Sequence, residues 1–527
     1  MTITIGKIFD LTVKKFPGKE ALYDTRSKVR MTYAEWDEEV NRLANALRSK
    51  GVKKGDRVST FLFNREELAT AFFACAKLGA IFNPINFRLM SEEVAYILQD
   101  ASPKVVLFEK SLEPVVARIE NRFQHISFWY TDEDVPEYAK HYKTKVTQAC
   151  AQFQAEKVEE TDTYAIMYTS GTTGRPKGVI HRHREMVEQS LVLIQSTKLS
   201  QHDRGLIIAP MFHCAELHCS FLPRVHIGAS NVVMHHFQPA QVLQEIEQEK
   251  ITKFFAAPTM WNMILQEDLG KYDISSLNLG LYGAAPMAPV LVRACQEKLG
   301  VNLVQAYGMT EMGPAITVLA EEDQIRKAGS AGQAILNHEI RIVRANEDGP
   351  SDPDDILPPC EPGEIIVQGP SMMAGYFNRD EDTEKAMYKG WYRSGDIGYL
   401  DEEGFLFVKD RVDDMIISGG ENVYPREVED LLYEHPGVLD VAVIGQPDDR
   451  WGETVTAFVV AKDSALTSEE LDLFCKNSDK LANYKRPRSY IFSESMPRNA
   501  SGKIQKFILR KRLEEELSPN KPSSPIV

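Results

Sequence analysis

A loop rich in glycine and hydroxyl side chains, YTSGTTGRPKG (168–178), is the sharpest candidate for chemistry in this sequence. It directly follows an apolar run, YAIMY (164–168), which predicts a strand ending where the loop begins. Glycines let a backbone turn tightly, so that hydroxyl and free N–H groups can surround a phosphate. The loop is not a Walker A motif, because Gly178 and not Ser or Thr follows Lys177. It predicts a phosphate-binding loop of another kind, with a ligand-free turn as the alternative.

Four later segments also combine turns with charged side chains. QAYGMTE (305–311) contains Glu311, a carboxylate of the kind that holds Mg²⁺. YRSGDIG (392–398) places Asp396 in a turn, where its carboxylate can accept hydrogen bonds from sugar hydroxyls. Arg411 lies where the composition shifts, and Lys503 lies in a turn near the C-terminus. Each segment taken alone also fits a surface turn, a solvated charge or a helix cap.

The elements that must position these residues predict an α/β fold. Thr32 and Glu35 form the capping box of an early helix. VSTFLF (58–63), a helix over 66–78 and VVLF (105–108) then alternate strand with helix. Such alternation predicts a parallel sheet with helices on its faces.

Two further changes of pattern divide the rest of the chain. Residues 340–410 are rich in Gly, Pro and Asp and contain short strand patterns, which predicts a small β-rich unit. After about 412 a compact α+β pattern begins, with a helix starting at Pro425 and strands at 438–445 and 454–461. We expect that helix to bury Val428, Leu431, Leu432 and His435.

Composition excludes several classes of function. The 527 residues include 61 Lys and Arg against 76 Asp and Glu, a net charge of −15, which argues against nucleic acid as a partner. The longest apolar stretch, Leu68 to Ile85, is broken by Lys77 and Asn83, so we expect no transmembrane segment. The seven cysteines have no regular spacing, and the first residues lack the pattern of a signal peptide. We therefore expect a cytoplasmic protein.

Together, in this order and spacing, the five segments resemble the adenylate-forming superfamily, which contains acyl-CoA synthetases, peptide adenylation domains and firefly-type luciferases. The resemblance runs from Thr32 to about Leu513. It implies an enzyme, an AMP-forming acid–thiol ligase. Its substrates would be a small-molecule carboxylic acid, ATP with Mg²⁺, and coenzyme A.

The resemblance also implies roles for individual residues. Lys503, Thr172, Glu311 and His213 would be catalytic, and Thr172 and Glu311 would hold the magnesium. Asp396 and Arg411 would bind the ribose. The remaining ATP-binding residues would be Thr169, Ser170, Gly171, Thr172, Thr173, Gly174, Lys177, Gly283, Ala284, Ala285, Pro286, Gln305, Ala306, Tyr307, Gly308, Met309 and Thr310. Coenzyme A would contact Ser418, Gly419, Gly420 and Trp451.

The same resemblance divides the chain into two domains and a tail. Residues 1–412 would form a large N-terminal domain of parallel-sheet α/β subdomains with a small β-rich subdomain. Residues 413–517 would form a small mobile α+β domain that rotates about the hinge residue Asp413 between the two half-reactions. Residues 518–527 would be a disordered tail.

The acyl pocket departs from the family pattern at one position. His213 would gate the pocket, and Trp261 would lie in another wall. Glu216 stands where relatives carry small or apolar residues, so it either recognises a polar group of the acid or pairs locally. The His and Cys residues of 213–236 also invite a metal site, although their spacing matches no standard zinc pattern.

Several alternatives remain. The sequence across residues 283–445 resembles bacterial medium- and long-chain fatty-acid CoA ligases most, which favours a fatty acid as substrate. An aromatic or betaine-type acid, or loading of a carrier protein, is also consistent with the motifs. A luciferase-like oxygenase and an inactive ATP-binding scaffold fit less well. The basic stretch GKIQKFILRKR (502–512) could contact a membrane surface or the CoA 3′-phosphate, or form a solvated helix face. A homodimer is also open.

Overall fold

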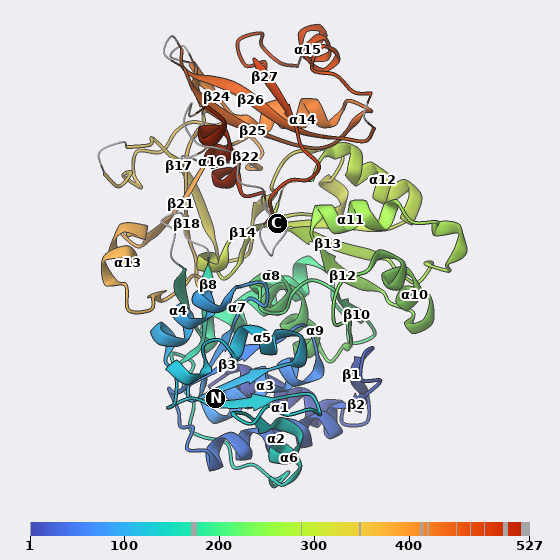
Figure 1. Cartoon of the computed structure of the whole chain (residues 1–527), viewed down its shortest axis with the longest axis vertical. Coiled ribbons are helices and arrows are strands. Elements are labelled where there is room, and N and C mark those ends of the chain that lie inside the picture. Colours follow the sequence, from blue (N-terminus) through green and yellow to red (C-terminus); the bar gives the residue numbers. More distant parts are fainter. Residues whose placement is uncertain are drawn as a thin grey trace. The chain divides into compact units, whose positions relative to one another are not determined.

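The computed structural model describes residues 2–169, 176–285, 287–346, 349–411, 414, 416–418, 421–448, 451–463, 465–478, 480–498 and 504–517. The chain divides into two compact units, each of which is described separately below. The first unit comprises residues 1–287, 291–340 and 367–392, and the second comprises 288–290, 341–366 and 393–527. Figure 1 shows the order of the elements along the chain.

The first unit contains two large, mainly parallel sheets. The strand order of one sheet is β16 (Gln333–Ala334), β15 (Ala315–Leu319), β14 (Asn302–Gly308), β13 (Leu279–Gly283), β12 (Lys253–Ala256), β10 (Arg204–Ile207), β11 (Ser230–Val233), β1 (Glu20–Asp24) and β2 (Arg30–Thr32). The order of the other is β19 (Gly375–Tyr376), β9 (Lys177–Arg182), β8 (Thr163–Thr169), β4 (Ile81–Pro84), β3 (Arg57–Phe61), β5 (Val105–Phe108), β6 (Ser127–Tyr130) and β7 (Lys140–His141). The parallel ladders confirm the predicted α/β class.

Helices of the first unit connect and cover these strands. They are α1 (Ile5–Lys15), α2 (Tyr33–Ser49), α3 (Glu66–Leu78), α4 (Ser91–Ala101), α5 (Glu113–Val116), α6 (Tyr142–Thr147), α7 (His183–Ser196), α8 (Cys214–Glu216), α9 (Leu222–Ile227), α10 (Pro239–Glu249), α11 (Pro258–Leu265) and α13 (Asp380–Ala386). A π-helical turn, η3 (Leu217–Phe221), joins α8 to α9. Helix α12 (Pro289–Leu299) begins in residues grouped with the second unit.

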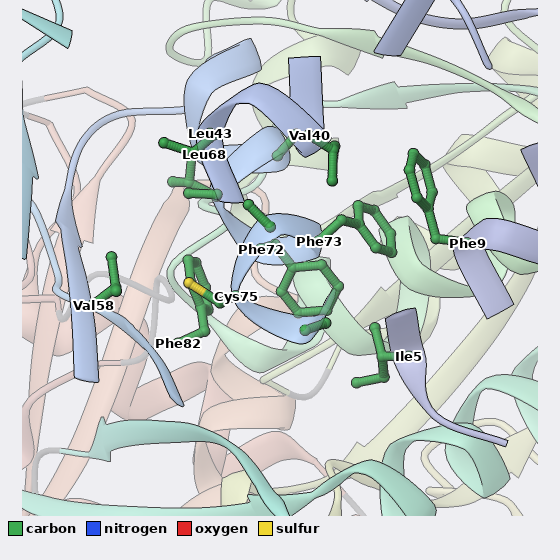
Figure 2. Close-up of a cluster of buried hydrophobic side chains, with 14 of the residues drawn as sticks. Ile5, Phe9, Val40, Leu43, Val58, Leu68, Phe72, Phe73, Cys75 and Phe82 are labelled. Carbon is green, nitrogen blue, oxygen red and sulfur yellow. The ribbon is translucent and has the colours of Figure 1, made fainter. Parts of the chain in front are cut away.

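The largest core of the first unit is built around α3, which is buried along almost its whole length. Phe73 stacks on Phe9 with ring centroids 4.4 Å apart, and Figure 2 shows these side chains together with Phe72. The lysine that interrupts this apolar stretch, Lys77, is buried and paired with Asp10 and Asp37. The charge of Lys77, which argued against a membrane span, is therefore neutralised by ion pairs inside a protein core.

The second unit contains most of a small β-sheet and a compact α+β segment. The first sheet uses β17 (Glu339–Val343), β18 (Gly363–Gln368), β20 (Met387–Tyr388), β21 (Trp391–Leu400) and β22 (Leu406–Arg411). The other uses β23 (Ile416–Ser418), β24 (Glu421–Val423), β25 (Val438–Asp448), β26 (Gly452–Ala461) and β27 (Ser489–Phe492). Helices α14 (Pro425–Tyr433), α15 (Ser468–Asn477) and α16 (Lys506–Leu517) accompany this second sheet.

Helix starts that were predicted from short sequence motifs are confirmed. The capping box of Thr32 and Glu35 is present in α2, and α14 begins at Pro425. Several boundaries were wrong. Strand β25 ends at Asp448 and β26 begins at Gly452, so both are longer than the predicted 438–445 and 454–461. Strand β3 ends at Phe61 and not at residue 63, and His435 lies beyond the end of α14, where its ring packs on Phe474. The predicted boundary between 412 and 413 stays a prediction, since the two units are defined by packing and not by movement.

Candidate active site

Two of the predicted ATP-binding segments, 283–285 and 305–310, lie at the carboxyl ends of two neighbouring parallel strands. Gly283 at the end of β13 is in register with Ala306 of β14. A Cβ on Gly283 would come within 2.5 Å of the Ala306 carbonyl oxygen, so only glycine permits this approach. The next residue, Ala284, has a φ of +65°, an unusual conformation for a residue with a side chain. Ligands of open α/β sheets bind at this edge.

Thr310 and Glu311 follow directly after β14, in the short helix η5 (Thr310–Met312). Both residues are largely buried, with 8% of their surface exposed. The Thr310 hydroxyl lies 3.2 Å from the sulfur of Cys214, the first residue of α8. This contact places Thr310, a predicted ATP-binding residue, beside the start of the helix that follows the predicted acyl gate, His213.

A chain of contacts joins the phosphate loop to Glu311. Lys177, at the start of β9, lies over the ring of Tyr376 with its Nζ 5.2 Å from the ring centroid. The Tyr376 hydroxyl donates a hydrogen bond of 3.0 Å to Oε1 of Glu311. Burial and the neighbouring Glu311 raise the pKa of Tyr376, so the hydroxyl keeps its proton and remains a donor. Cation, aromatic ring and carboxylate therefore form one connected unit.

Two members of this arrangement were absent from the sequence predictions. Tyr376 reaches the site because β19 pairs with β9, where Tyr376 is in register with Val179. Asp382, on α13, forms an ion pair of 2.9 Å with Lys177. Neither residue belongs to the predicted motifs, and no spacing rule links positions 376 and 382 to position 177. A negative partner on Lys177 means that a phosphate must compete with Asp382 for this cation.

His213 caps the N-terminus of α8. Its Nδ1 accepts a hydrogen bond of 3.1 Å from the backbone N–H of Ala215. Burial lowers the pKa of His213 to about 4, because the protein around the ring excludes the water that would stabilise the charged form. At neutral pH the side chain is therefore an uncharged imidazole, suited to gate a pocket by shape and hydrogen bonding.

Glu216 and Trp261, the other predicted pocket residues, are both completely buried. Oε1 of Glu216 accepts a hydrogen bond of 2.9 Å from Nη2 of Arg224, so this carboxylate pairs locally. Burial raises the pKa of Glu216 to about 7, although Arg224 opposes the shift. Trp261 stacks on Phe254 at 4.5 Å within a core cluster. Phe254 lines a small cavity in the first unit, and Trp261 is not among the residues that line it.

The second unit brings its own predicted residues together in pairs. Asp396 of β21 is in register with Arg411 of β22, which places the two predicted ribose ligands side by side on one antiparallel ladder. Ser418 is in register with Gly452, the residue after Trp451, so two of the predicted CoA contacts are neighbours on the sheet formed by β23 and β26. Trp451 is 47% exposed.

Other predicted site residues lie outside the described part of the chain. These are Ser170, Gly171, Thr172, Thr173, Gly174, Pro286, Asp413, Gly419, Gly420 and Lys503. The same holds for the predicted tail, 518–527. Of the two predicted magnesium ligands, Glu311 lies within the described part of the chain. Its largely buried carboxylate, oriented by Tyr376, offers the oxygen donors that Mg²⁺ prefers.

The histidine-rich region has a different arrangement from a metal centre. Among the described residues, no group of three or more His, Cys, Asp or Glu side chains is placed to hold a metal ion. His181 and His218 instead pack in the core with ring centroids 5.4 Å apart. Burial lowers the pKa of His181 to about 3.

Two surface properties of the described residues bear on membrane contact. No helix in these ranges combines the length and the apolar character needed to cross a bilayer. Residues 506–512 of the basic stretch lie in α16, where Lys506 pairs with Glu429 and Arg510 pairs with Asp414. Leu509 and Leu513 of the same helix are buried. Part of the basic charge is thus neutralised within the second unit.

Comparison with known proteins identifies the family of this chain. Residues 9–377 match the AMP-binding enzyme family, and residues 427–503 match the AMP-binding enzyme C-terminal domain. The long-chain-fatty-acid–CoA ligase FadD13 of Mycobacterium tuberculosis is 36% identical over 500 residues, covering 94% of this chain and 96% of that protein. A feruloyl-CoA synthase of an Amycolatopsis species is 38% identical over 488 residues, covering 92% and 94%.

Among solved structures, the anthranilate CoA ligase AuaEII in complex with anthranoyl-AMP superposes with a TM-score of 0.90. It is 27% identical in sequence, and the match covers 98% of each chain. Strand-end loops, a buried Thr–Glu pair and a lysine-bearing hairpin thus occur in a chain that matches these enzymes along nearly its whole length. This chain belongs to the AMP-binding enzyme family, the adenylate-forming enzymes.

Proposed function

We propose that this chain is an ATP-dependent acyl-CoA ligase that acts on a medium- or long-chain fatty acid. In the first half-reaction a carboxylate oxygen bonds to the α-phosphorus of ATP and pyrophosphate leaves. In the second, the sulfur of coenzyme A, having lost its proton, bonds to the carbonyl carbon of the acyl-adenylate and AMP leaves.

The observation that carries this proposal is the connected set Lys177, Tyr376 and Glu311, with Thr310 beside it. A carboxylate approaching a triphosphate is repelled, so the site must supply positive charge and hydrogen-bond donors at the phosphates. Lys177 supplies a positive charge at the loop, and the Thr310 hydroxyl lies where α8 begins. Magnesium held by Glu311 and Thr172 would supply further neutralisation of the phosphate charge.

The remaining roles follow the family. The phosphate loop 169–174 and Lys177 hold the β- and γ-phosphates, and residues 283–286 with 305–309 line the adenine. Asp396 and Arg411 hold the ribose, and their register pairing supports this role. Ser418, Gly419, Gly420 and Trp451 contact coenzyme A, and the pairing of Ser418 with Gly452 supports it.

Lys503 and Asp413 make the active site differ between the two half-reactions. Lys503 bridges the acid carboxylate and the α-phosphate in the first step, and rotation about Asp413 removes it before the second. Replacing Lys503→Ala should lower adenylate formation by at least about 100-fold, because a cation at the developing charge is lost. Thioester formation from supplied acyl-adenylate should stay within about 3-fold of the unchanged protein. Equal losses in both steps would contradict the rotation.

The experiment that tests the proposed function measures pyrophosphate release from ATP, with and without coenzyme A, for a panel of acids. The panel runs from acetate to palmitate and includes aromatic and betaine-type acids, because the named relatives act on fatty, feruloyl and anthranilate acids. Formation of the CoA thioester from a fatty acid supports the proposal. Release of pyrophosphate without any acid dependence would refute it, and transfer to a carrier protein alone would favour the adenylation-domain alternative.

We further propose a cytoplasmic location, supported by the seven cysteines, all of which are free thiols in the structure. A homodimer and a peripheral membrane contact also remain proposals. Sedimentation at several protein concentrations tests the first, and binding to anionic vesicles tests the second.

A further inference from the structure

A small cavity in the first unit lies between the helix that follows His213 and strands β12 and β13. Its volume is about 20 Å³, room for roughly one water molecule or one polar atom of a ligand. Leu279, Leu281 and Phe254 form an apolar wall, and Ser220, Arg224 and Lys253 form a polar one. Such a mixture is typical of a ligand site, where a few polar groups select among ligands of similar shape.

Two members of the polar wall, Ser220 and Arg224, come from one face of the helix, whereas Lys253 comes from β12 and Glu216 lies outside the lining. Glu216, Ser220 and Arg224 are spaced by four residues, so they follow one another along that face. All three side chains are buried, and these polar groups contribute nothing to the binding of an apolar acyl chain. Gly205 on β10 makes room for this arrangement, because a Cβ there would lie 2.2 Å from Cδ of Arg224.

Arg224 has hydrogen-bonding capacity to spare. Its guanidinium donates to Asn231 through Nε, to Ser220 through Nη1 and to Glu216 through Nη2. These bonds use three of the five N–H groups of an arginine, which leaves two among the contacts of the described residues. Oε2 of Glu216 is also buried without a hydrogen-bond partner among the described residues. Buried groups of this kind are costly unless something satisfies them.

Two independent measures place the cavity at a defined distance from the adenylate site. Along the helix, Cys214 contacts Thr310, and Ser220 and Arg224 lie six and ten residues further on. These separations are at most roughly 9 and 15 Å at the α-helical rise of about 1.5 Å per residue, because the π-helical turn η3 is part of this path. Along β13, Leu281 and Leu279 lie two and four residues before Gly283, roughly 7 and 13 Å at about 3.3 Å per residue. Both measures give a span of about 9–13 Å.

From this geometry we propose that the acid carries an oxygen hydrogen-bond acceptor at its far end, about 9–13 Å from the reacting carboxylate, which Arg224 recognises in this cavity. The span corresponds to about seven to ten carbon atoms in an extended chain, at roughly 1.25 Å per carbon. The inference rests on the proposed ligase function and narrows its substrate class. A hydroxyl, a carbonyl or a second carboxylate shares this chemistry.

The charge of Glu216 decides which of these acceptors binds best. With Glu216 ionised the pair with Arg224 is neutral overall, which suits a hydroxyl or carbonyl. With Glu216 protonated the pair is cationic, which suits a carboxylate. Burial raises the pKa of Glu216 to about 7, so both states are accessible near neutral pH.

The test compares matched acids on the unchanged protein, with kcat/KM for acyl-CoA formation as the readout. Octanoate is compared with 8-hydroxyoctanoate and octanedioate, and cinnamate with 4-hydroxycinnamate. We expect at least one oxygen-bearing acid to exceed its matched apolar acid by about 10-fold or more. Comparing 8-hydroxyoctanoate with octanedioate shows whether the site prefers a neutral hydroxyl or an anionic carboxylate at the far end of the acid. Equal or better use of both apolar acids overturns the proposal, whereas no reaction with any acid points to failure of the ligase function itself.

A paired variant, Glu216→Gln with Arg224→Met, removes both charges at once and avoids leaving one buried charge unpaired. We expect the preference for the far oxygen to fall below about 3-fold, while butyrate, which ends before Ser220, keeps its kcat/KM within about 3-fold. The matched control, Asp37→Asn with Lys77→Met, removes another buried ion pair from the α2–α3 core and should keep the preference. Retention of the preference in the Glu216 and Arg224 variant would overturn the role of Arg224. If that variant does not fold, the comparison of matched acids on the unchanged protein still decides the proposal.

Discussion

Replacing Tyr376→Phe tests whether the contact chain between Lys177 and Glu311 positions the carboxylate that we propose binds magnesium. The variant removes one hydroxyl, whose hydrogen bond to Oε1 of Glu311 measures 3.0 Å. It keeps the aromatic ring that lies 5.2 Å from Nζ of Lys177. Loss of function would therefore report on the carboxylate and not on the lysine.

The magnitude follows from the type of bond that is lost. Tyr376 and Glu311 are both 8% exposed, so water replaces the lost donor poorly. A hydrogen bond to a charged group contributes about 1.5–3 kcal/mol. At about 1.4 kcal/mol per tenfold, kcat/KM for adenylate formation should fall by about 10- to 150-fold. The same loss should raise the Mg²⁺ concentration needed for half-maximal rate by about 10- to 100-fold.

The assay is acid-dependent pyrophosphate release over a Mg²⁺ titration, at saturating ATP and acid. Tyr433→Phe is the matched control, because its hydroxyl donates at 2.5 Å to Asp440, another carboxylate, in the second unit. The control should show an unchanged Mg²⁺ dependence. A Tyr376→Phe enzyme with the rate and Mg²⁺ dependence of the unchanged protein, within about 2-fold, would refute the positioning role.

Three further perturbations have defined outcomes. Asp382→Asn should tighten ATP binding by about 2- to 5-fold in calorimetry. In the unchanged protein Lys177 must break its partly exposed ion pair with Asp382, worth about 0.2–1 kcal/mol, before it can bind a phosphate. Weaker binding of ATP by the variant would count against this account. Gly280→Ala should destabilise the first unit by about 1–3 kcal/mol in urea unfolding, since the new Cβ would lie 2.4 Å from Cζ2 of Trp261. Gly270→Ala, whose nearest contact would be 3.6 Å away, should leave the midpoint unchanged. Burial lowers the pKa of His181 to about 3 from 6.5, so the folded state binds fewer protons and stability falls as pH drops below about 6.5. The unchanged protein should lose free energy of unfolding on the order of 4 kcal/mol between pH 6.5 and 3 through His181, and His181→Phe should remove this loss. Identical pH dependence of the unfolding free energy in the two proteins would contradict the assignment.

Elements with a local cause could be predicted from the sequence. A capping box selects the start of α2, proline in the first turn selects the start of α14, and the 3.6-residue period marks their buried faces. The family, the α/β class and the order of the motifs also follow from the sequence, because each motif is a continuous run of residues. Boundaries such as the end of β3 depend on pairing with β4 and β5 and were less accurate.

Tertiary structure alone decided which residues share the site. Tyr376 reaches Lys177 and Glu311 only because β19 pairs with β9, and no periodicity in the sequence identifies that partner. The direction in which the Glu216 side chain points was likewise open in the sequence. The structure shows that Arg224, two helical turns away, donates a hydrogen bond to Glu216 in a buried ion pair. Hydrogen-bond ladders and ion pairs between distant segments form when folding brings them together. Residue order therefore determined the chemistry available to this protein, and packing determined which groups could act on one another.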